Sequence, residues 1–188
     1  FPESHAASFA LLVYVSAWLK YHYPAAFTCA LLNSLPMGFY APSQLVQDAQ
    51  RHGVEVRPVD VRRSDSVSTL EGRALRLGLD RIKGLSAQAG EDIVVARRQG
   101  PFASIQELAH RAGLNRRDLR ALSGANALAG LAGHRHRAHW HSAAVEERMP
   151  ADDLLHGVHF DEQALPMLRS PTEGEDIVAD YTSLGLTL

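Results

Sequence analysis

Apolar residues recur at helical spacing through the first third of the chain. Residues 4–21 are apolar on nearly every side, which predicts a helix of about 27 Å that is buried all round. Pro24 suits the first turn of a second helix over 25–33. A third helix is expected from near Pro42 to a stop at Gly53. Its apolar side carries Leu45, Val46 and Ala49.

The pattern then changes to a period of two. Valine alternates with polar or charged residues over 54–59, which indicates a short strand. Leu75, Leu77 and Leu79 alternate in the same way and predict a second one. The polar residues 62–72 between them favour an exposed loop. The two extended segments are therefore expected to pair as a small β ribbon.

Helical signals return after residue 82. A helix is expected from about Ser86 to its end at Gly100, and Ser104-Ile-Gln-Glu has the pattern of a capping box. That box begins a short helix, and Asn115 follows as the N-cap of another over 116–122. One more helix is expected over 138–148. Residues 150–180 show no sustained periodicity, so the fold class is mostly α with a small β ribbon.

Charge is distributed unevenly along these 188 residues. The formal net charge is −2, which argues against a nucleic-acid protein. Residues 61–140, however, carry 14 Lys+Arg against 7 Asp+Glu, a net of +7, and residues 141–188 carry 2 against 10, a net of −8. A basic centre with an acidic arm is typical of nucleic-acid binding. A merely solvated charged face is the alternative.

Composition excludes several classes of protein. No apolar run approaches the roughly 18 residues that a membrane span needs, so we expect no membrane association. The one cysteine, Cys29, has no partner for an internal disulfide, which excludes a disulfide-stapled scaffold. It lies on an apolar helix and is expected to be an inert core thiol.

Two short helix–turn–helix units in the basic centre are the main candidate site. One turn is centred on Lys83-Gly84-Leu85-Ser86 and the other on Ala112-Gly113-Leu114-Asn115. Glycine permits a positive φ and a close backbone approach, and the N–H groups of the following helix attract a phosphate. The expected DNA-binding residues are Arg81, Lys83, Gly84, Leu85, Ser86, Gly113, Leu114, Asn115, Arg116 and Arg117. Helical packing with ordinary glycine turns is the alternative.

Other clusters of polar residues give weaker evidence for a functional site. The spacing of His134, His136, His139 and His141 is irregular for zinc, and no calcium-loop pattern accompanies the acidic residues, so no metal site is expected. No phosphate-loop, serine-hydrolase or zinc-protease motif occurs. We therefore expect no catalytic residue in this chain. The lack of paired carboxylates also disfavours a stand-alone nuclease or phosphotransferase.

Long blocks of the sequence resemble one family. FPESHAASFA (1–10), AWLKYHYPAAF (17–27) and ALLNS (30–34) are similar to bacterial C-family DNA polymerases, the polymerase III alpha subunit and its relatives. PMGFY (36–40) and DAQRHGVEVRP (48–58) resemble the error-prone, ImuC-type translesion branch. The segments 77–85 and 100–104 and the second turn resemble the tandem helix-hairpin-helix region of the same family.

The resemblance implies a division of the chain. Residues 1–53 correspond to the helical end of the fingers domain, and 54–133 to short strands plus a tandem helix-hairpin-helix module. Residues 134–188 are a basic His-rich turn, a helix and an acidic linker toward a missing OB-fold. The palm, with its metal-binding aspartates and Mg²⁺, lies upstream in the family and outside this chain. Ser4 and His5 would begin a helix that faces the incoming nucleotide.

The expected function follows from both arguments. The chain is predicted to be a non-catalytic DNA-binding section of a bacterial, cytoplasmic, error-prone DNA polymerase for damage-induced translesion synthesis. It would grip the sugar–phosphate backbone of template–primer duplex without sequence specificity. The alternative is a protein-interaction module that docks a translesion accessory protein or the rest of the polymerase.

Overall fold

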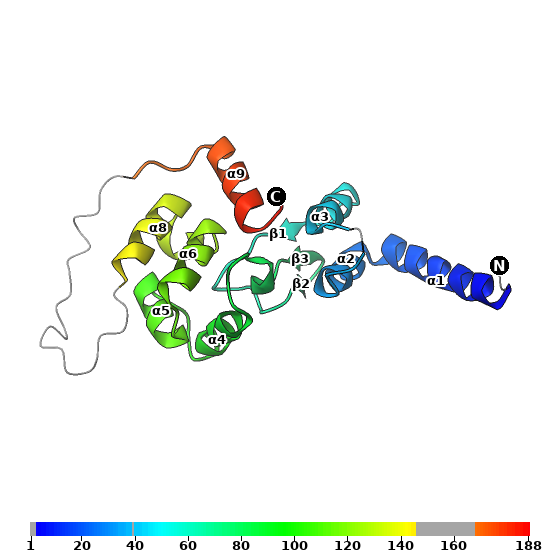
Figure 1. The fold of residues 1–188 in the computed structure, drawn as a ribbon, viewed down its shortest axis with the longest axis horizontal. Coiled ribbons are helices and arrows are strands. Elements are labelled where there is room, and N and C mark those ends of the chain that lie inside the picture. Colours follow the sequence, from blue (N-terminus) through cyan, green and yellow to red (C-terminus); the bar gives the residue numbers. More distant parts are fainter. Residues whose placement is uncertain (1–2, 39, 146–167) are drawn as a thin grey trace, which may run out of the picture. The chain divides into compact units, whose positions relative to one another are not determined.

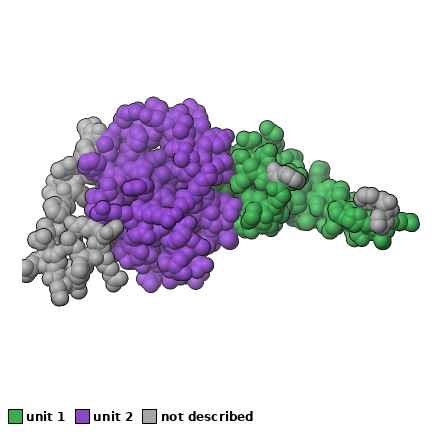
Figure 2. All heavy atoms as spheres, in the orientation of Figure 1, with its two compact units in different colours: residues 1–58, 68–77, 188 green, residues 59–67, 78–187 purple. Residues whose placement is uncertain are grey.

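The computed structural model describes residues 3–38, 40–145 and 168–188. The chain is mostly helical with one small sheet, so the predicted fold class is confirmed (Figure 1). Its contacts divide it into two compact units (Figure 2). Unit 1 comprises residues 1–58, 68–77 and 188, and unit 2 comprises 59–67 and 78–187. Each unit is described by itself below.

Unit 1 contains the three predicted helices, α1 (Glu3–His22), α2 (Pro24–Asn33) and α3 (Pro42–Arg51). Proline stands at the first position of α2 and of α3, where its missing N–H has no helical partner to lose. Helix α3 ends just before Gly53, whose φ is +77°. The predicted inward side of α3 is confirmed, because Leu45, Val46 and Ala49 are buried.

Helix α1 forms as predicted, but the expectation that it is buried was wrong. None of its residues is buried in the structure. Its contacts gather at its end, where Lys20 Nζ lies 2.8 Å from Asp48 Oδ2 and the Trp18 ring lies 5.8 Å from that of Tyr23. Its most exposed large apolar side chains are Phe9, Leu11, Leu12, Val13, Tyr14 and Tyr21. A helix that is apolar on all sides is expected to be buried, but its sequence does not identify the surface that buries it.

The sheet has three strands in the order β1-β3-β2. They are β1 (Val56–Arg57), β2 (Thr69–Glu71) and β3 (Ala74–Arg76). The two predicted extended segments do pair, but in parallel, with Val56 opposite Leu75. Strand β2, within the predicted loop, pairs antiparallel with β3 around Gly72, whose φ is +65°. Every residue of β3 is buried. The period-two pattern in its sequence therefore does not correspond to one buried side and one exposed side.

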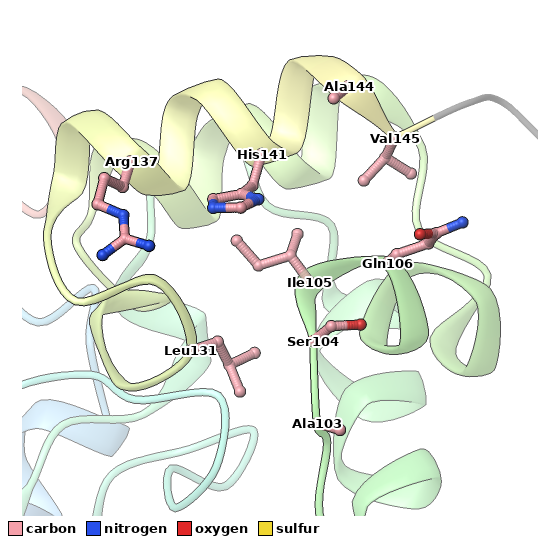
Figure 3. A pocket seen from close by; sticks show the side chains of 9 residues that line it. All are labelled: Ala103, Ser104, Ile105, Gln106, Leu131, Arg137, His141, Ala144 and Val145. Atoms are coloured by element: carbon pink, nitrogen blue, oxygen red, sulfur yellow. The ribbon is translucent and has the colours of Figure 1, made fainter. Parts of the chain in front are cut away.

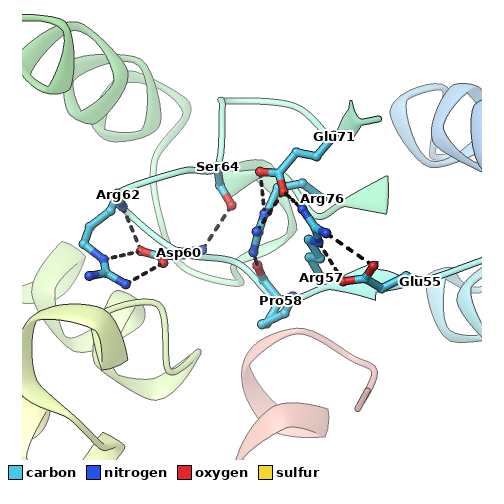
Figure 4. Close-up of polar contacts among 8 residues, drawn as sticks. All are labelled: Glu55, Arg57, Pro58, Asp60, Arg62, Ser64, Glu71 and Arg76. Atoms are coloured by element: carbon cyan, nitrogen blue, oxygen red, sulfur yellow. Dashed lines mark hydrogen bonds and ion pairs between the residues drawn. The ribbon is translucent and has the colours of Figure 1, made fainter. Parts of the chain in front are cut away.

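A charge network inside unit 1 holds the sheet (Figure 4). Arg76, with 7% of its side chain exposed, donates from Nε and Nη2 to the Glu71 carboxylate at 3.0 Å each. Its Nη1 donates to the Pro58 carbonyl at 2.7 Å, and Arg57 Nη1 reaches Glu71 at 2.6 Å. Arg76 first and Arg57 second lower the pKa of Glu71 to about 2. Arg57 also binds the exposed Glu55 at 2.7 Å.

Helix α2 is tied to the segment before β2 by polar contacts. The Asn33 amide donates to the Ser68 carbonyl at 2.9 Å and accepts from the Ser68 N–H at 3.0 Å. Cys29 Sγ donates to the same carbonyl at 3.2 Å. Cys29 is buried, as predicted, and burial raises the pKa of its thiol. The free thiol therefore serves packing and remains protonated.

The first regular elements described in unit 2 are a 3₁₀ turn, η1 (Leu79–Arg81), and then the helices α4 (Ala87–Arg98), α5 (Ile105–Ala112) and α6 (Arg116–Gly124). Three short elements complete it: α7 (Ala129–Ala132), α8 (Arg135–Ala144) and α9 (Glu173–Ser183). The predicted helices α4, α5 and α6 are confirmed. Its core is made of fully buried apolar side chains, among them Leu79, Ile93, Leu108, Leu119, Leu122 and Leu128.

The later helices differ from the prediction. Helix α8 begins at Arg135, three residues before the predicted start, because the His134 ring caps the Arg137 N–H. It ends at Ala144, and the predicted end at 148 lies outside the described residues, as does most of 145–172. The expectation that 150–180 lacks periodic structure was wrong at its end, where Thr172 caps α9.

Helix α9 packs into unit 2, although its acidic residues suggested a solvated arm. The buried Arg135 pairs with Asp176 at 3.1 Å and with Asp180. The Lys83 N–H donates to the Ser183 carbonyl at 2.8 Å. Just after the helix, Leu184 and Leu186 are buried. Residues distant in sequence therefore fix α9 in place.

Candidate nucleic-acid interface

Both predicted glycine turns have the backbone conformation that the sequence suggested. Gly84 has φ +87° and Gly113 has φ +60°. These values lie in the left-handed region, where a side chain strains the backbone. Gly113 ends α5 and leaves one residue, Leu114, before the cap of α6. Gly84 lies between η1 and α4 and likewise leaves one residue, Leu85, before Ser86, the N-cap of α4.

Packing within unit 2 brings the first turn against the helix of the second. A Cβ placed on Gly84 would lie 3.9 Å from Ala121 Cβ on α6. Arg117 lies one helical turn before Ala121, and residues four apart share a helix face. The first glycine turn (81–86) thus packs against α6, the helix that follows the second glycine turn (113–117).

The first turn offers free backbone N–H groups. Ser86 is the N-cap of α4, and its Oγ accepts from the Ala89 N–H at 3.1 Å. Among the described residues, the N–H groups of Gly84, Ser86, Ala87 and Gln88 have no acceptor. The α4 dipole places partial positive charge at the same point. The turn therefore presents unpaired N–H donors of the kind that can bind an anion.

The second turn is electrostatically different. Asn115 Oδ1 accepts from the N–H groups of Arg117 and Asp118 at 2.8 and 3.0 Å. The buried Asp118 carboxylate accepts from the Asn115 N–H at 3.4 Å, which completes a capping box. These amides are satisfied within the chain, and a carboxylate already occupies the helix start. At the second turn, the groups that remain available to an anion are therefore side-chain cations and not backbone N–H groups.

The cations near the two glycine turns fall into two groups. Arg81 pairs with Asp80 at 2.5 Å, and Lys83 Nζ donates to the Tyr181 carbonyl at 3.1 Å. Arg97 donates to the carbonyls of Val61 and Ser64 and to Asp65, so it has a structural role. The outward-facing cations are Arg98, Arg116, Arg117 and Arg120. Within the described part of the chain, Arg98, Arg117 and Arg120 have no carboxylate partner.

The histidines of residues 134–141 have different surroundings. His136 Nδ1 lies 2.9 Å from the Arg169 carbonyl, and the rings of His134 and His136 lie 6.1 Å apart. Burial first, then the charges of Arg135 and Arg120, lower the pKa of His139. The described residues contain no group of three or more His, Cys, Asp or Glu placed to hold a metal ion.

Ser4 and His5, the residues predicted to face a nucleotide, lie in the first turn of α1 in unit 1. The Ser4 carbonyl accepts from Ser8 Oγ at 2.9 Å, and the His5 ring lies 4.4 Å from that of Phe9. Both residues are exposed. These contacts lie within α1 and connect neither residue to another element.

Sequence reasoning missed how α9 engages the first turn. Lys83 bonds to two carbonyls at the end of α9, those of Tyr181 and Ser183. A cation beside a helix C-terminus is favourable. The pattern Thr172-x-x-Glu175 marks the start of α9, because Thr172 Oγ1 and the Glu175 carboxylate form a capping box. That signal identifies the helix but not its site of packing.

Comparison with known proteins gives two findings. Residues 53–138 match a family of sequences described as a helix-hairpin-helix motif. Across its whole length the chain is 60% identical to an error-prone DNA polymerase of Alkalilimnicola ehrlichii and 54% identical to that of Methylococcus capsulatus. It is 52% identical to that of Burkholderia pseudomallei. The chain spans only 18%, 20% and 18% of these relatives.

No helix in the described part of the chain is both long enough and apolar enough to cross a bilayer.

Proposed function

We propose that this chain is the DNA-binding section of an error-prone DNA polymerase used in damage-induced translesion synthesis. Its relatives bear the name error-prone DNA polymerase at 50–60% identity over the whole chain. The helix-hairpin-helix match covers both glycine turns. The resemblance of the blocks 1–10, 17–27 and 30–34 to bacterial C-family polymerases, and of 36–40 and 48–58 to the ImuC-type branch, supports the same proposal.

The packing of Gly84 against Ala121 carries this proposal. It sets the free N–H groups of the first turn beside the α6 helix that bears Arg117 and Arg120. A sugar–phosphate backbone has anionic groups at regular intervals, which suits backbone donors at one point and guanidinium groups at the next. Such contacts read no base, so binding is independent of sequence. Template–primer duplex is the proposed ligand.

Catalysis belongs to other parts of the whole polymerase. Nucleotidyl transfer and its Mg²⁺ are assigned to palm aspartates outside this chain, and 1–53 to the end of the fingers. Residues 54–133 form the DNA-binding module and 134–188 a connection toward an OB-fold. In the whole protein, Ser4 and His5 face the nucleotide. A primer-extension assay tests the first assignment, since template-directed extension by this chain alone would contradict it.

A second function has support from α1. A helix of 20 residues, none of them buried, exposes apolar side chains that a stable protein covers. The chain would then dock a translesion accessory protein or the remainder of the polymerase through α1. This function concerns unit 1, whereas DNA binding concerns unit 2, so a variant of one leaves the other intact.

Titration with fluorescent duplex DNA tests the main proposal. Two duplexes of unrelated sequence are titrated at about 50 and 200 mM salt. A protein that makes several phosphate contacts binds DNA more weakly by orders of magnitude at the higher salt concentration. We expect equal affinities for the two duplexes and a steep loss with salt. No binding at low salt, or strong preference for one duplex, would contradict backbone recognition by this chain.

A further inference from the structure

Unit 2 contains a cavity of about 160 Å³ between the start of α5 and one side of α8 (Figure 3). Its walls include Ser104, Ile105 and Gln106 from α5 and Arg137 and His141 from α8, with Leu131 at its floor. None of its lining residues belongs to 81–86 or 113–117. The cavity is therefore separate from the two glycine turns.

Two cationic or potentially cationic side chains line one wall. Arg137 and His141 lie four residues apart on α8, so both extend from the same face of that helix. Figure 3 shows both across from the start of α5. Arg137 is exposed and His141 is half-buried. Neither side chain has a hydrogen-bond or ion-pair partner among the residues that the structure describes.

The start of α5, which forms the opposite wall, has backbone N–H groups without a partner among the described residues. Ser104 Oγ accepts from the Glu107 N–H at 3.1 Å, while the N–H groups of Ile105 and Gln106 find no acceptor in the described part of the chain. Glu107, the acidic residue of this turn, does not line the cavity. Its carboxylate binds Arg111 and the Ala103 N–H at 2.8 Å each. Its charge is therefore compensated.

We propose that this cavity binds a phosphate group. Arg137 offers a planar guanidinium that matches two oxygens of a phosphate, and His141 offers a ring N–H. The Ile105 and Gln106 amides supply further donors from the far wall. At about 30 Å³ for each water molecule, the cavity has room for an oxyanion with part of its hydration shell. The phosphate group would be that of inorganic phosphate, a DNA end or a DNA backbone.

The test is an amide-resolved NMR titration of the 188-residue chain with inorganic phosphate, against chloride at equal ionic strength. We expect saturable shifts at Ile105, Gln106 and His141 with phosphate alone. Arg137→Gln should weaken binding about tenfold, the loss expected for a charged hydrogen-bond partner. The matched variant Arg51→Gln, at an exposed arginine of unit 1 outside the cavity, should bind as the parent does. Shifts that chloride reproduces, or that Arg137→Gln leaves intact, would overturn the proposal.

Oligonucleotides then identify the source of the phosphate. A 5′-phosphorylated duplex that competes with inorganic phosphate better than its 5′-hydroxyl counterpart identifies a DNA end. Equal competition by both identifies the backbone, and competition by neither identifies the free anion. Because Arg137 lies outside both glycine turns, failure of Arg137→Gln to alter phosphate binding leaves the proposed duplex binding untouched. Loss of duplex binding alone would likewise leave the cavity proposal standing.

Discussion

Glu71→Gln is the most informative perturbation of unit 1. The substitution keeps the size of the side chain and removes the charge that Arg76 needs. Arg76 has 7% of its side chain exposed, and Glu71 accepts from Arg76 Nε and Nη2 at 3.0 Å each and from Arg57 Nη1 at 2.6 Å. Removal of one partner from a buried pair leaves an uncompensated buried charge. The variant is therefore expected to destabilise the sheet of unit 1.

The magnitude follows from the pKa of Glu71. Its native pKa is about 2 against an ordinary value of 4.5, a difference that corresponds to about 3 kcal/mol. Because the native pKa is lowered, this stabilisation is complete above pH 4.5 and is lost as the pH falls toward 2. Linkage leaves about 1 kcal/mol of it near pH 2.5. The variant should therefore lose about 3 kcal/mol at neutral pH and about 1 kcal/mol in acid.

The assay is urea unfolding followed by the amide NMR signals of Leu75 and Leu77, which bond across the sheet of unit 1 to the Glu55 and Arg57 carbonyls. Glu55→Gln is the matched control, because Glu55 is exposed and touches only Arg57 within this network. We expect a much smaller change from that variant. A loss equal to that of the control, or one of the same size in acid as at neutral pH, would refute the reasoning.

Three further predictions concern packing and caps. Leu122→Ala should lower the free energy of unfolding of unit 2 by about 2–5 kcal/mol in thermal denaturation, because Leu122 is fully buried. Asn115→Ala should cost about 1 kcal/mol in urea unfolding, whereas Asn115→Asp should retain most of the cap that bonds two N–H groups. Cys29 should resist an aromatic disulfide reagent until unit 1 unfolds, since its thiol is buried and its pKa raised. Rapid labelling of the native chain would contradict the last.

Local chemistry accounts for what the sequence predicted well. Ser104 and Asn115 cap α5 and α6 through their own side chains, so neighbouring residues define both helix starts. Proline acts in the same way in α2 and α3. The left-handed turn at Gly113 follows from one residue type at the end of one helix. Each of these features depends on a few consecutive residues.

Features that depend on distant partners were predicted poorly. Strand β2 exists because β3 pairs with it, and its own three residues carried no clear strand signal. The expectation that Lys83 lies at a phosphate stays a prediction, but its bond to the end of α9, about a hundred residues later in the chain, was not foreseen. The contact of Gly84 with Ala121 likewise joins segments that no local pattern connects. Tertiary packing decides all three.

The salt dependence of duplex binding tests the central claim most directly. The slope of log affinity against log salt is measured for the parent chain, for Arg117→Gln with Arg120→Gln, and for Arg51→Gln. Arg51 is an exposed arginine of unit 1, outside the helix-hairpin-helix match, and serves as the charge-matched control. Each lost phosphate contact lowers the slope by about 0.9, so the double variant should lose about 2 and the control nothing. A double variant with the slope of the parent would contradict backbone binding at α6.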